Sequence, residues 1–337
     1  MKIGIVTDQP MAAQVLRRAI ALQPEYEIIW VAQDGAEGVA LCVKQTPDLV
    51  LLALIMRNMN GIEATRRIMA RAPCAILIIS ANTGTNATGV YEAMGYGALD
   101  AVDAPSLDAK NPRASAAPLL AKVDSIKRRL RSEHDTLRSA TQLFASAPAW
   151  QPERLVAIGV SAGGPAALAE LLSSLPVNFP AAIVIVQHVD ARFAAGLASW
   201  LDQQSPLPVR VAQEGDRLTV GTVLLAGTSN HLILTAQRLL RYTREPIDYV
   251  YRPSVDAFFH SVCQYWPFVA VGVLLTGMGR DGAVGLRALR DKGCHTIAQD
   301  EASSAVYGMP KAAAMLDAAV DILPINQIAS RLIDILG

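Results

Sequence analysis

The sequence lacks long apolar runs, an excess of charge of either sign, and more than a few cysteines. Its apolar runs, such as LVLLAL, AAIVIV and FVAVGVLL, are far shorter than the ~20 residues of a membrane-spanning helix. The 337 residues carry 30 basic and 30 acidic side chains, and a net charge of zero argues against a general nucleic-acid surface. The first residues, MKIGIVTDQP, predict a strand rather than a signal peptide. We expect a protein that neither enters a membrane nor binds nucleic acid.

The cysteines have no metal-ligand spacing and lie in apolar or ordinary contexts. They are Cys42, Cys74, Cys263 and Cys294. Cysteines of this kind are typical of buried free thiols in a reducing compartment. We therefore expect a cytoplasmic protein without a metal site.

What the sequence has is apolar content, 52% of its residues, in a chain long enough for two domains. In the first hundred residues, strand and helix patterns alternate. Strands are expected at 2–7, 27–32, 48–53, 75–80 and 98–103. This alternation predicts a doubly wound (βα)5 domain with a parallel sheet over residues 1–131.

A second α/β series follows a stretch rich in Ser, Ala, Pro and Gln. That stretch, residues 132–152, reads as a linker. Strands are then expected at 154–161, 182–187, 207–212, 222–234, 269–276 and 295–299, and helices at about 193–203, 254–264 and 283–292. The prediction is a second doubly wound α/β domain over residues 153–337, with a mainly parallel sheet.

The stretch PDLVLLALIMRNMNG places an inert residue where chemistry is expected. A buried strand, Leu49 to Leu52, is followed by a turn and then by a helical pattern. In α/β domains, ligands bind beyond the carboxyl ends of such strands. The residue at that point is Ala53.

This half of the chain resembles the receiver domain of two-component response regulators. That family has an acidic pair after strand one, an acceptor Asp after strand three, a hydroxyl after strand four and Lys-Pro after strand five. Here the matching positions hold a single acid, Asp8, then Ala53, Ser80 and Ala104, and the Pro of the turn after the acceptor is replaced by Arg57.

These replacements remove the phosphorylation chemistry. Mg²⁺ needs several hard oxygen ligands, and alanine has no nucleophile. A laboratory Asp→Ala change could explain Ala53 alone. Because Arg57 and Ala104 depart with it, natural degeneracy is favoured. Asp8 is either a remnant of the metal site or a turn and capping residue.

Three strand ends of the second domain deliver a serine, a histidine and an aspartate. Ser161 stands in GVSAGG on a strand-to-helix turn, His188 ends AAIVIVQH, and Asp281 follows the strand in GVLLTGMGRDG. A serine nucleophile needs a base, and the base needs a carboxylate that sets its tautomer. Alternatively, Ser161 is a helix cap and His188 a structural histidine.

Two other interpretations use overlapping residues. Gly277, Gly279 and Gly282, with Asp300 at the end of the next strand, match a dinucleotide-binding pattern on paper. Asp281 weakens it, because a carboxylate there would repel pyrophosphate, and so does the late position of the motif.

The second interpretation is an ordinary α/β-hydrolase with Ser161, Asp248 or Asp281, and His295. Its family order is Ser, acid, His. Ser161 follows the first strand of its domain, without the earlier strands that build that fold's oxyanion loop.

Five stretches resemble, in order, the effector domain of the chemotaxis methylesterase CheB family. They are GVSAGGPAAL, VIVQH, YRPSVDAFFHSV, GVLLTGMGRDGAVGL and AQDEASSAVYGMPKAA. With the receiver-like half, the resemblance covers nearly the whole chain. YEAMGYGALDAVDAP is further similar to the subgroup that serves Wsp-type surface-sensing pathways. One departure is VDARF after His188, where the family often has Met-Pro-Pro.

The resemblance implies hydrolysis of glutamate γ-methyl esters, and deamidation of glutamines, on the cytoplasmic domains of methylated chemoreceptors. It implies catalytic Ser161, His188 and Asp281, no metal or organic cofactor, and a chemotaxis-type histidine kinase as a further partner. Ala162, Gly163, Gly164 and Met278 fall at its oxyanion and substrate positions. The alternative function is a non-enzymatic adaptor that keeps the fold and binds receptors or a kinase.

Overall fold

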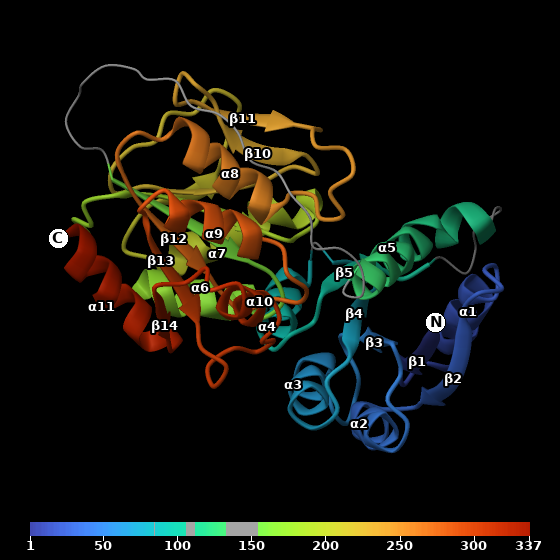
Figure 1. The fold of residues 1–337 in the computed structure, drawn as a ribbon. Helices are drawn as coiled ribbons and strands as arrows, with labels where there is room; N and C mark the ends of the chain where they lie inside the picture. The colour runs from blue at the N-terminus through green and yellow to red at the C-terminus, as the bar shows by residue number, and fades with distance from the viewer. Residues whose placement is uncertain (84, 106–111, 133–153) are drawn as a thin grey trace. The chain divides into compact units, whose positions relative to one another are not determined.

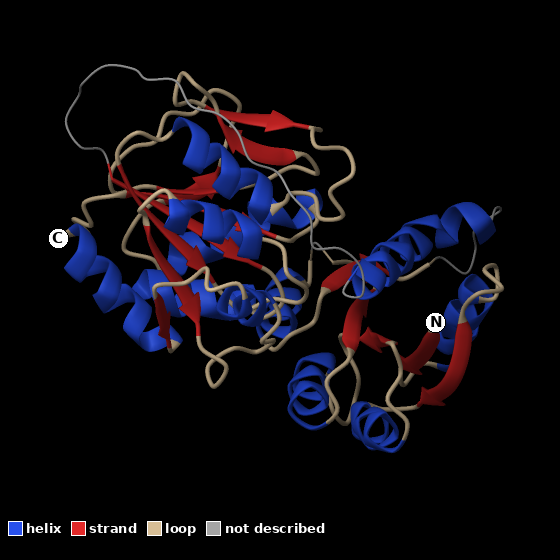
Figure 2. Cartoon of the chain, in the orientation of Figure 1, coloured by secondary structure: helices blue, strands red, loops and turns tan. Residues whose placement is uncertain are grey.

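The computed structural model describes residues 1–83, 85–105, 112–132 and 154–337. The chain divides into two compact units, Met1–Arg131 and Ser132–Gly337, each with its own parallel sheet (Figure 2). Of the expected linker, 132–152, only Ser132 is described, as the last residue of a helix; the rest lies outside the described residues. None of the helices within the described ranges is long and apolar enough to cross a membrane.

The first unit is a five-stranded parallel sheet in the order β2-β1-β3-β4-β5. Its strands are β1 (Lys2–Val6), β2 (Glu27–Ala32), β3 (Leu49–Ala53), β4 (Ala75–Ser80) and β5 (Asp100–Asp103). Its helices are α1 (Pro10–Ile20), α2 (Gly35–Lys44), α3 (Gly61–Arg71), α4 (Ala87–Gly95) and α5 (Pro112–Ser132). Figure 1 shows α1 and α5 on one face of this sheet and α2 and α3 on the other.

The second unit has seven parallel strands in the order β14-β13-β12-β6-β7-β9-β8. They are β6 (Arg154–Val160), β7 (Ala182–Gln187), β8 (Val209–Val211), β9 (Val223–Leu225), β12 (Val269–Leu274), β13 (His295–Gln299) and β14 (Asp321–Leu323). An antiparallel hairpin of β10 (His231–Leu234) and β11 (Leu240–Thr243) accompanies it.

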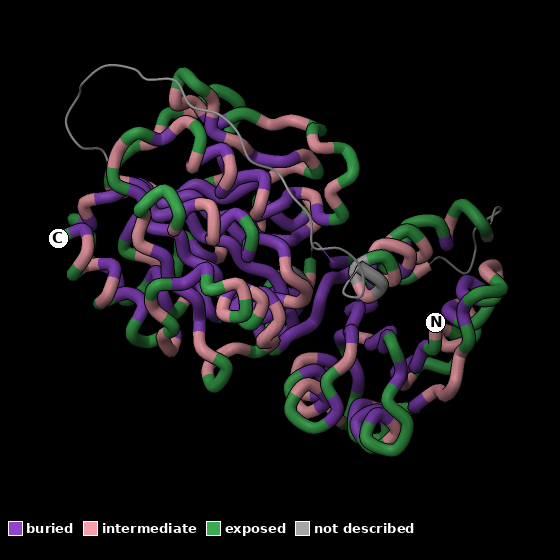
Figure 3. Tube along the Cα trace, in the orientation of Figure 1, coloured by how far each residue is buried: buried purple, intermediate pink, exposed green. Residues whose placement is uncertain are grey.

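Helices cover both faces of this sheet. They are α6 (Gly164–Ser173), α7 (Ala191–Gln204), α8 (Val255–Tyr265), α9 (Ala283–Asp291), α10 (Met309–Met315) and α11 (Ile325–Leu336). Helix α6 packs against α7 and α11, while α8 packs against α9 and β10. The central strands are buried, and exposed residues lie on the outer helix surfaces and at the edge strands β8 and β14 (Figure 3). The predicted doubly wound α/β class is confirmed for both units.

Side-chain caps fix where several helices begin. Asp34, Asn60 and Ser254 each accept a hydrogen bond from the backbone N–H three residues later, at the starts of α2, α3 and α8. Such caps satisfy N–H groups that have no partner inside the helix. The local sequence therefore determines where these three helices begin.

Several elements differ from expectation. The strand-like piece at 222–234 splits into β9 and β10, because the chain turns at 227–230, where Asn230 N donates to Thr228 Oγ1 (3.1 Å). The elements β11, α10, β14 and α11 were not predicted. The strands among them are only three and four residues long, too short to show a clear period.

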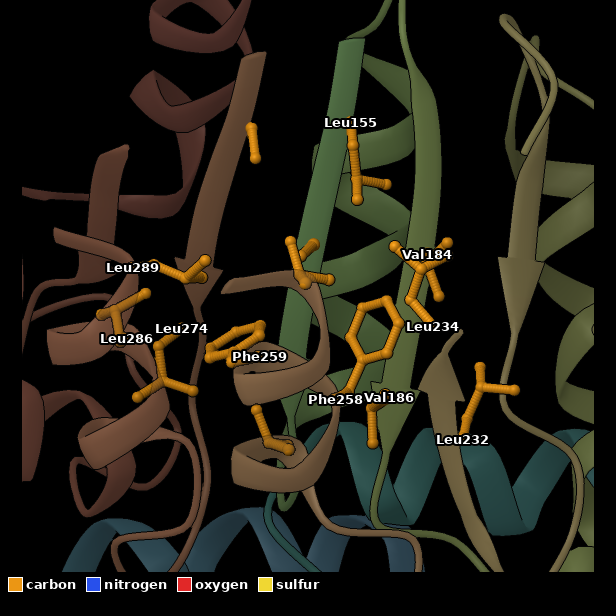
Figure 4. Packing of buried hydrophobic residues seen from close by; sticks show 14 of the residues in the cluster. Leu155, Val184, Val186, Leu232, Leu234, Phe258, Phe259, Leu274, Leu286 and Leu289 are labelled. Atoms are coloured by element: carbon orange, nitrogen blue, oxygen red, sulfur yellow. The ribbon is translucent and has the colours of Figure 1, made fainter. Parts of the chain in front are cut away.

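One hydrophobic cluster of the second unit lies between α8, α9 and the sheet. Phe258 of α8 lies beside Val184 of the sheet and Leu234 of the hairpin, and Phe259 lies on the side of Leu274 (Figure 4). All five side chains are fully buried. This packing holds the amino terminus of α8 next to the ends of the central strands, where the candidate site lies.

Candidate active site

The candidate site lies where the strand order of the second sheet reverses. Strand β6 has β7 on one side and β12 on the other, so the chain winds outward in both directions from β6. Open α/β sheets bind ligands at the carboxyl ends of the strands at this point. Ser161 directly follows β6, His188 follows β7, and Asp281 lies in the loop after β12.

Backbone hydrogen bonds hold the three segments together. His188 N donates to Val160 O (3.1 Å), directly before Ser161, and Ser161 N donates to Thr276 O (3.0 Å), two residues after the end of β12. A Cβ built on Gly277 would lie 2.7 Å from Ser161 Cβ. The loop with Met278 and Asp281 therefore starts in contact with the serine.

Ser161 is held on a tight turn. Its carbonyl accepts from Gly164 N (2.9 Å) and from Gln187 Nε2 (2.8 Å). Gly163 has a left-handed φ of +81°, which glycine adopts without steric cost. Ser161 itself is buried, with 4% of its surface exposed. The turn thus fixes the position of the hydroxyl-bearing residue through its backbone.

His188 and Asp281 form a buried pair. His188 Nε2 lies 2.7 Å from Asp281 Oδ2, and both residues are buried. The ring of Tyr251 stacks on the imidazole, with centroids 4.5 Å apart and planes 13° from parallel. The histidine is therefore held by its carboxylate partner at one atom and by an aromatic face along its plane.

Asp281 accepts hydrogen bonds from the start of α8. Val255 N donates to Oδ2 (2.7 Å), Asp256 N to Oδ1 (3.1 Å) and Ser254 Oγ to Oδ1 (2.9 Å). A helix N-terminus stabilises negative charge. Burial opposes ionisation of Asp281, but the hydrogen bond and charge of His188 and the N–H groups of α8 outweigh it. Together they hold the pKa of Asp281 below its usual value.

A second carboxyl group, Asp256, lies in the first turn of α8. It accepts from Gly285 N, in the first turn of α9, at 2.7 Å. Burial and the negative charge of Asp281 raise the pKa of Asp256 well above its usual value. The pKa values of the two neighbouring acids are therefore shifted in opposite directions, that of Asp281 downward and that of Asp256 upward.

The residues expected around the oxyanion lie in this region. Ala162 and Gly163 follow Ser161 in its turn, and Met278 follows Gly277, which contacts Ser161. The N–H of Gly164 already donates to Ser161 O, so Gly164 serves the turn. Candidate oxyanion donors are then the N–H groups of Ala162 and Met278, and this assignment stays a prediction.

Side chains occupy the space next to the glycines of the glycine-rich loop, where a dinucleotide would have to lie. A Cβ on Gly277 would meet Met309 Sδ at 2.3 Å, and one on Gly279 would meet Tyr251 Oη at 2.1 Å. Asp300 accepts from Ser303 N (3.0 Å) and Ser303 Oγ (2.6 Å) in a local turn. Asp281 turns toward α8 rather than toward the helix that follows it. The dinucleotide interpretation is therefore wrong.

The ordinary hydrolase interpretation fails on geometry. His295 is the first residue of β13, at the opposite end of the strands from Ser161. Its Nε2 pairs with Asp321 Oδ2 at 2.7 Å. Asp248 is exposed. Neither residue belongs to the Ser161 site.

In the first unit, the polar residues Asp8 and Ser80, at positions that resemble a phosphorylation site, are bound by neighbouring side chains. Asp8 Oδ2 accepts from Arg57 N (3.1 Å) and Arg57 Nε (3.2 Å). Ser80 Oγ accepts from Asn86 Nδ2 (3.0 Å). Mg²⁺ needs carboxylate and other oxygen ligands, but here one carboxylate faces an arginine and Ala53 supplies no ligand. The residues do not fit the metal of a working receiver.

Sequence reasoning missed several residues around the triad. Tyr251, Ser254 and Asp256 all contact His188 or Asp281, and all lie in the motif YRPSVDAFFHSV. The motif marked the segment, but not which side chains face the site. His231 bonds to Ser254 N (3.1 Å) and carried no sequence signal.

Comparisons with known proteins cover both units. Residues 156–332 match the family described as CheB methylesterase, and residues 3–110 match the response regulator receiver domain. A protein-glutamate methylesterase/protein-glutamine glutaminase of Pseudomonas syringae is 57% identical, over 99% of both chains. One of Burkholderia thailandensis is 58% identical, over 99% of this chain and 97% of its own.

A solved structure agrees. The CheB methylesterase catalytic domain of Thermotoga maritima superposes with a TM-score of 0.51 at 35% identity, over 55% of this chain and all of that domain. The expected family resemblance is therefore confirmed. The chain belongs to the CheB methylesterase family and has an N-terminal response regulator receiver domain.

Proposed function

We propose that this protein hydrolyses glutamate γ-methyl esters on the cytoplasmic domains of methylated chemoreceptors, using Ser161, His188 and Asp281. The observation that carries the proposal is the buried His188–Asp281 pair at 2.7 Å, beside a strand end that presents Ser161. The names of the relatives support the reaction class. We place this activity in residues 153–337 and in the cytoplasm.

The mechanism is acyl transfer. His188 takes the proton of Ser161 Oγ, and the oxygen attacks the ester carbonyl. Because Asp281 engages Nε2, the proton passes to Nδ1, which reverses the ring orientation of the serine-protease triad. Asp281 stabilises the resulting imidazolium. Methanol leaves with that proton, and water then releases the glutamate.

The oxyanion binds backbone N–H groups of Ala162 and Met278. Loss of one such donor costs about 3–4 kcal/mol of transition-state stabilisation. Glutamine deamidation uses the same acyl-enzyme, with ammonia in place of methanol. The double name of the relatives, methylesterase and glutaminase, supports this second substrate.

The receiver unit, residues 1–131, works without phosphorylation of its own. The Arg57–Asp8 contact supports natural degeneracy, because a single laboratory change at position 53 would not produce it. Partner docking, including docking to a chemotaxis-type histidine kinase, is the role we propose for this unit. Residues 132–152 link it to the catalytic unit.

The test is methanol release from receptor membranes that carry labelled methyl groups. Ser161→Ala should reduce release to the level of the buffer blank while the thermal unfolding midpoint stays nearly unchanged, because a turn hydroxyl adds little to the core. Ser330→Ala, at an exposed serine of α11, is the matched control and should keep full activity. A wild-type protein that releases no methanol would favour the adaptor alternative instead.

A further inference from the structure

His231 joins the two ends of a loop that reaches the triad. Its Nε2 lies 3.1 Å from Pro246 O, and its Nδ1 lies 3.1 Å from Ser254 N. The two backbone partners are eight residues apart in sequence. One fully buried imidazole therefore closes the loop 246–254.

The two contacts determine the tautomer of His231. A backbone N–H can only donate, so Nδ1 is the acceptor from Ser254. A carbonyl can only accept, so Nε2 carries the hydrogen and donates to Pro246. Both ring nitrogens are then satisfied in the neutral form. A protonated ring would set a second N–H against the N–H of Ser254.

The surroundings of His231 favour this neutral form. Burial has the largest effect and lowers the pKa of His231, and the charge of Arg252 lowers it further. The hydrogen bond to Pro246 O and the charges of Asp281 and Glu245 raise the pKa. The net direction is downward. The rings of Tyr249 and His231 form a T-shaped contact, with centroids 5.9 Å apart and planes at 79°.

The closed loop touches both the base and the acid of the triad. Tyr251 stacks on His188 at 4.5 Å, and Ser254 Oγ donates to Asp281 Oδ1 at 2.9 Å. Ser254 also caps α8 by accepting from Ala257 N (3.2 Å). A shift of Ser254 would therefore move the donors that hold Asp281.

His231 itself stands on a rigid support. It is the first residue of β10, whose Leu232 and Leu234 are fully buried in the core (Figure 4). Leu234 N donates to Ser261 Oγ of α8 at 2.9 Å. The strand is thus tied to α8 at both ends, by Ser254 N at one and Ser261 Oγ at the other.

We propose that His231 is a positioning residue for catalysis, which clasps the loop 246–254 and so holds Tyr251 against His188 and Ser254 against Asp281. The proposal rests on the function proposed above. What it adds is that the hydrogen bond between Ser254 N and His231 Nδ1 sustains kcat, and that filling the same buried space with another side chain is not enough.

Two variants of the full chain separate the two ring nitrogens. In His231→Asn, the amide oxygen can take the place of Nδ1 and accept from Ser254 N. In His231→Gln, the longer amide can reach Pro246 O but leaves Ser254 N without its acceptor. We expect kcat for methanol release within about threefold of wild type for Asn. For Gln we expect a fall of roughly ten- to a hundredfold, the scale of small misplacements in active sites, with KM within about twofold.

His295→Asn is the matched control, because it breaks a His–Asp contact of 2.7 Å at the other end of the strands, and kcat should not change. Equal kcat values for the Asn and Gln variants, whether high or low, would overturn the proposal. A wild-type protein without methanol release would instead overturn the proposed function.

A measurement on the wild-type protein does not depend on how the variants fold. Histidine ¹⁵N NMR of the full chain should show His231 with a hydrogen on Nε2 and an unprotonated Nδ1 at pH 7. The opposite tautomer, or a charged ring, would contradict the proposal that His231 bridges Pro246 O and Ser254 N.

Discussion

Asp256 and Asp281 bind the start of each other's helix. Asp281, which directly precedes the capping residue of α9, accepts from Asp256 N (3.1 Å) in the first turn of α8. Asp256, in that same turn, accepts from Gly285 N (2.7 Å) in the first turn of α9. The exchange fastens the loop that carries the triad carboxylate to α8, a helix whose apolar face is buried in the core.

The Asp256→Asn variant should gain stability relative to the wild-type protein as the pH rises. The folded-state pKa of Asp256 is raised above its usual value of 3.8, so the folded protein binds a proton that the unfolded chain releases. Stability is therefore lost as the pH rises from about 4 toward the folded-state pKa. Asparagine keeps the acceptor for Gly285 N and has no such loss.

The unfolding midpoint of the Asn variant minus that of wild type should grow between pH 4 and pH 8, measured by calorimetry. Asp334→Asn, at an exposed residue of α11, serves as the control and should show a much smaller trend. A difference independent of pH for Asp256→Asn would mean that Asp256 is ionised in the folded protein.

Asp281→Asn should reduce kcat for methanol release by roughly 10⁴-fold, the scale seen when a triad aspartate becomes asparagine. The carboxylate accepts from His188 Nε2, Ser254 Oγ, Val255 N and Asp256 N. An amide has only one acceptor oxygen, so its NH₂ group would face a donor. Activity near that of wild type would exclude Asp281 as the partner of the catalytic base.

Gly163→Ala should cost more than Gly215→Ala, although both residues have positive φ, +81° and +85°. A Cβ at 163 would lie 2.5 Å from Ala305 Cβ and 3.0 Å from Thr276 Oγ1, whereas one at 215 meets nothing within 4 Å. The left-handed conformation costs about 1–2 kcal/mol at either site. Overpacking adds about 1–3 kcal/mol at 163 alone.

Denaturant unfolding of both variants measures this difference. Because Gly163 shapes the turn of Ser161, methanol release should also fall at least tenfold in Gly163→Ala and stay unchanged in Gly215→Ala. Similar losses in the two variants would show that the turn relaxes around the added methyl group.

Small phosphodonors with Mg²⁺ should leave no base-labile phosphate on this chain, since Ala53 has no nucleophile. Ala53→Asp alone should restore labelling poorly. Arg57, whose side chain is 86% exposed, keeps Asp8 occupied at 3.2 Å, and Ala104 supplies no ammonium for the phosphate.

The triple variant Ala53→Asp, Arg57→Ala, Ala104→Lys should label faster than the single one, measured as acid-stable incorporation over time. Efficient labelling of Ala53→Asp by itself would mean that Mg²⁺ readily displaces Arg57 from Asp8.

The sequence alone determined the features that depend on local pattern. The strands with continuous apolar runs, the glycine turn of Ser161 and the missing acceptor at Ala53 follow from residue type and short-range period. The family resemblance also rested on short ordered stretches. The strands β11 and β14 are too short to show a clear period. Helix α11 was missed although its buried residues Ile325, Ile328, Ala329, Leu332 and Leu336 follow a helical period.

The tertiary structure decided which of these residues meet. Asp248, Asp281, His188 and His295 were all candidates by type, and only the strand order β12-β6-β7 brings Asp281 and His188 to Ser161. The sequence pattern set Asp281 beside α9, yet its carboxylate binds the N-terminus of α8. The loop clasped by His231 could not be foreseen either. Parallel strand order and helix packing are long-range contacts, and no local preference of the chain encodes them.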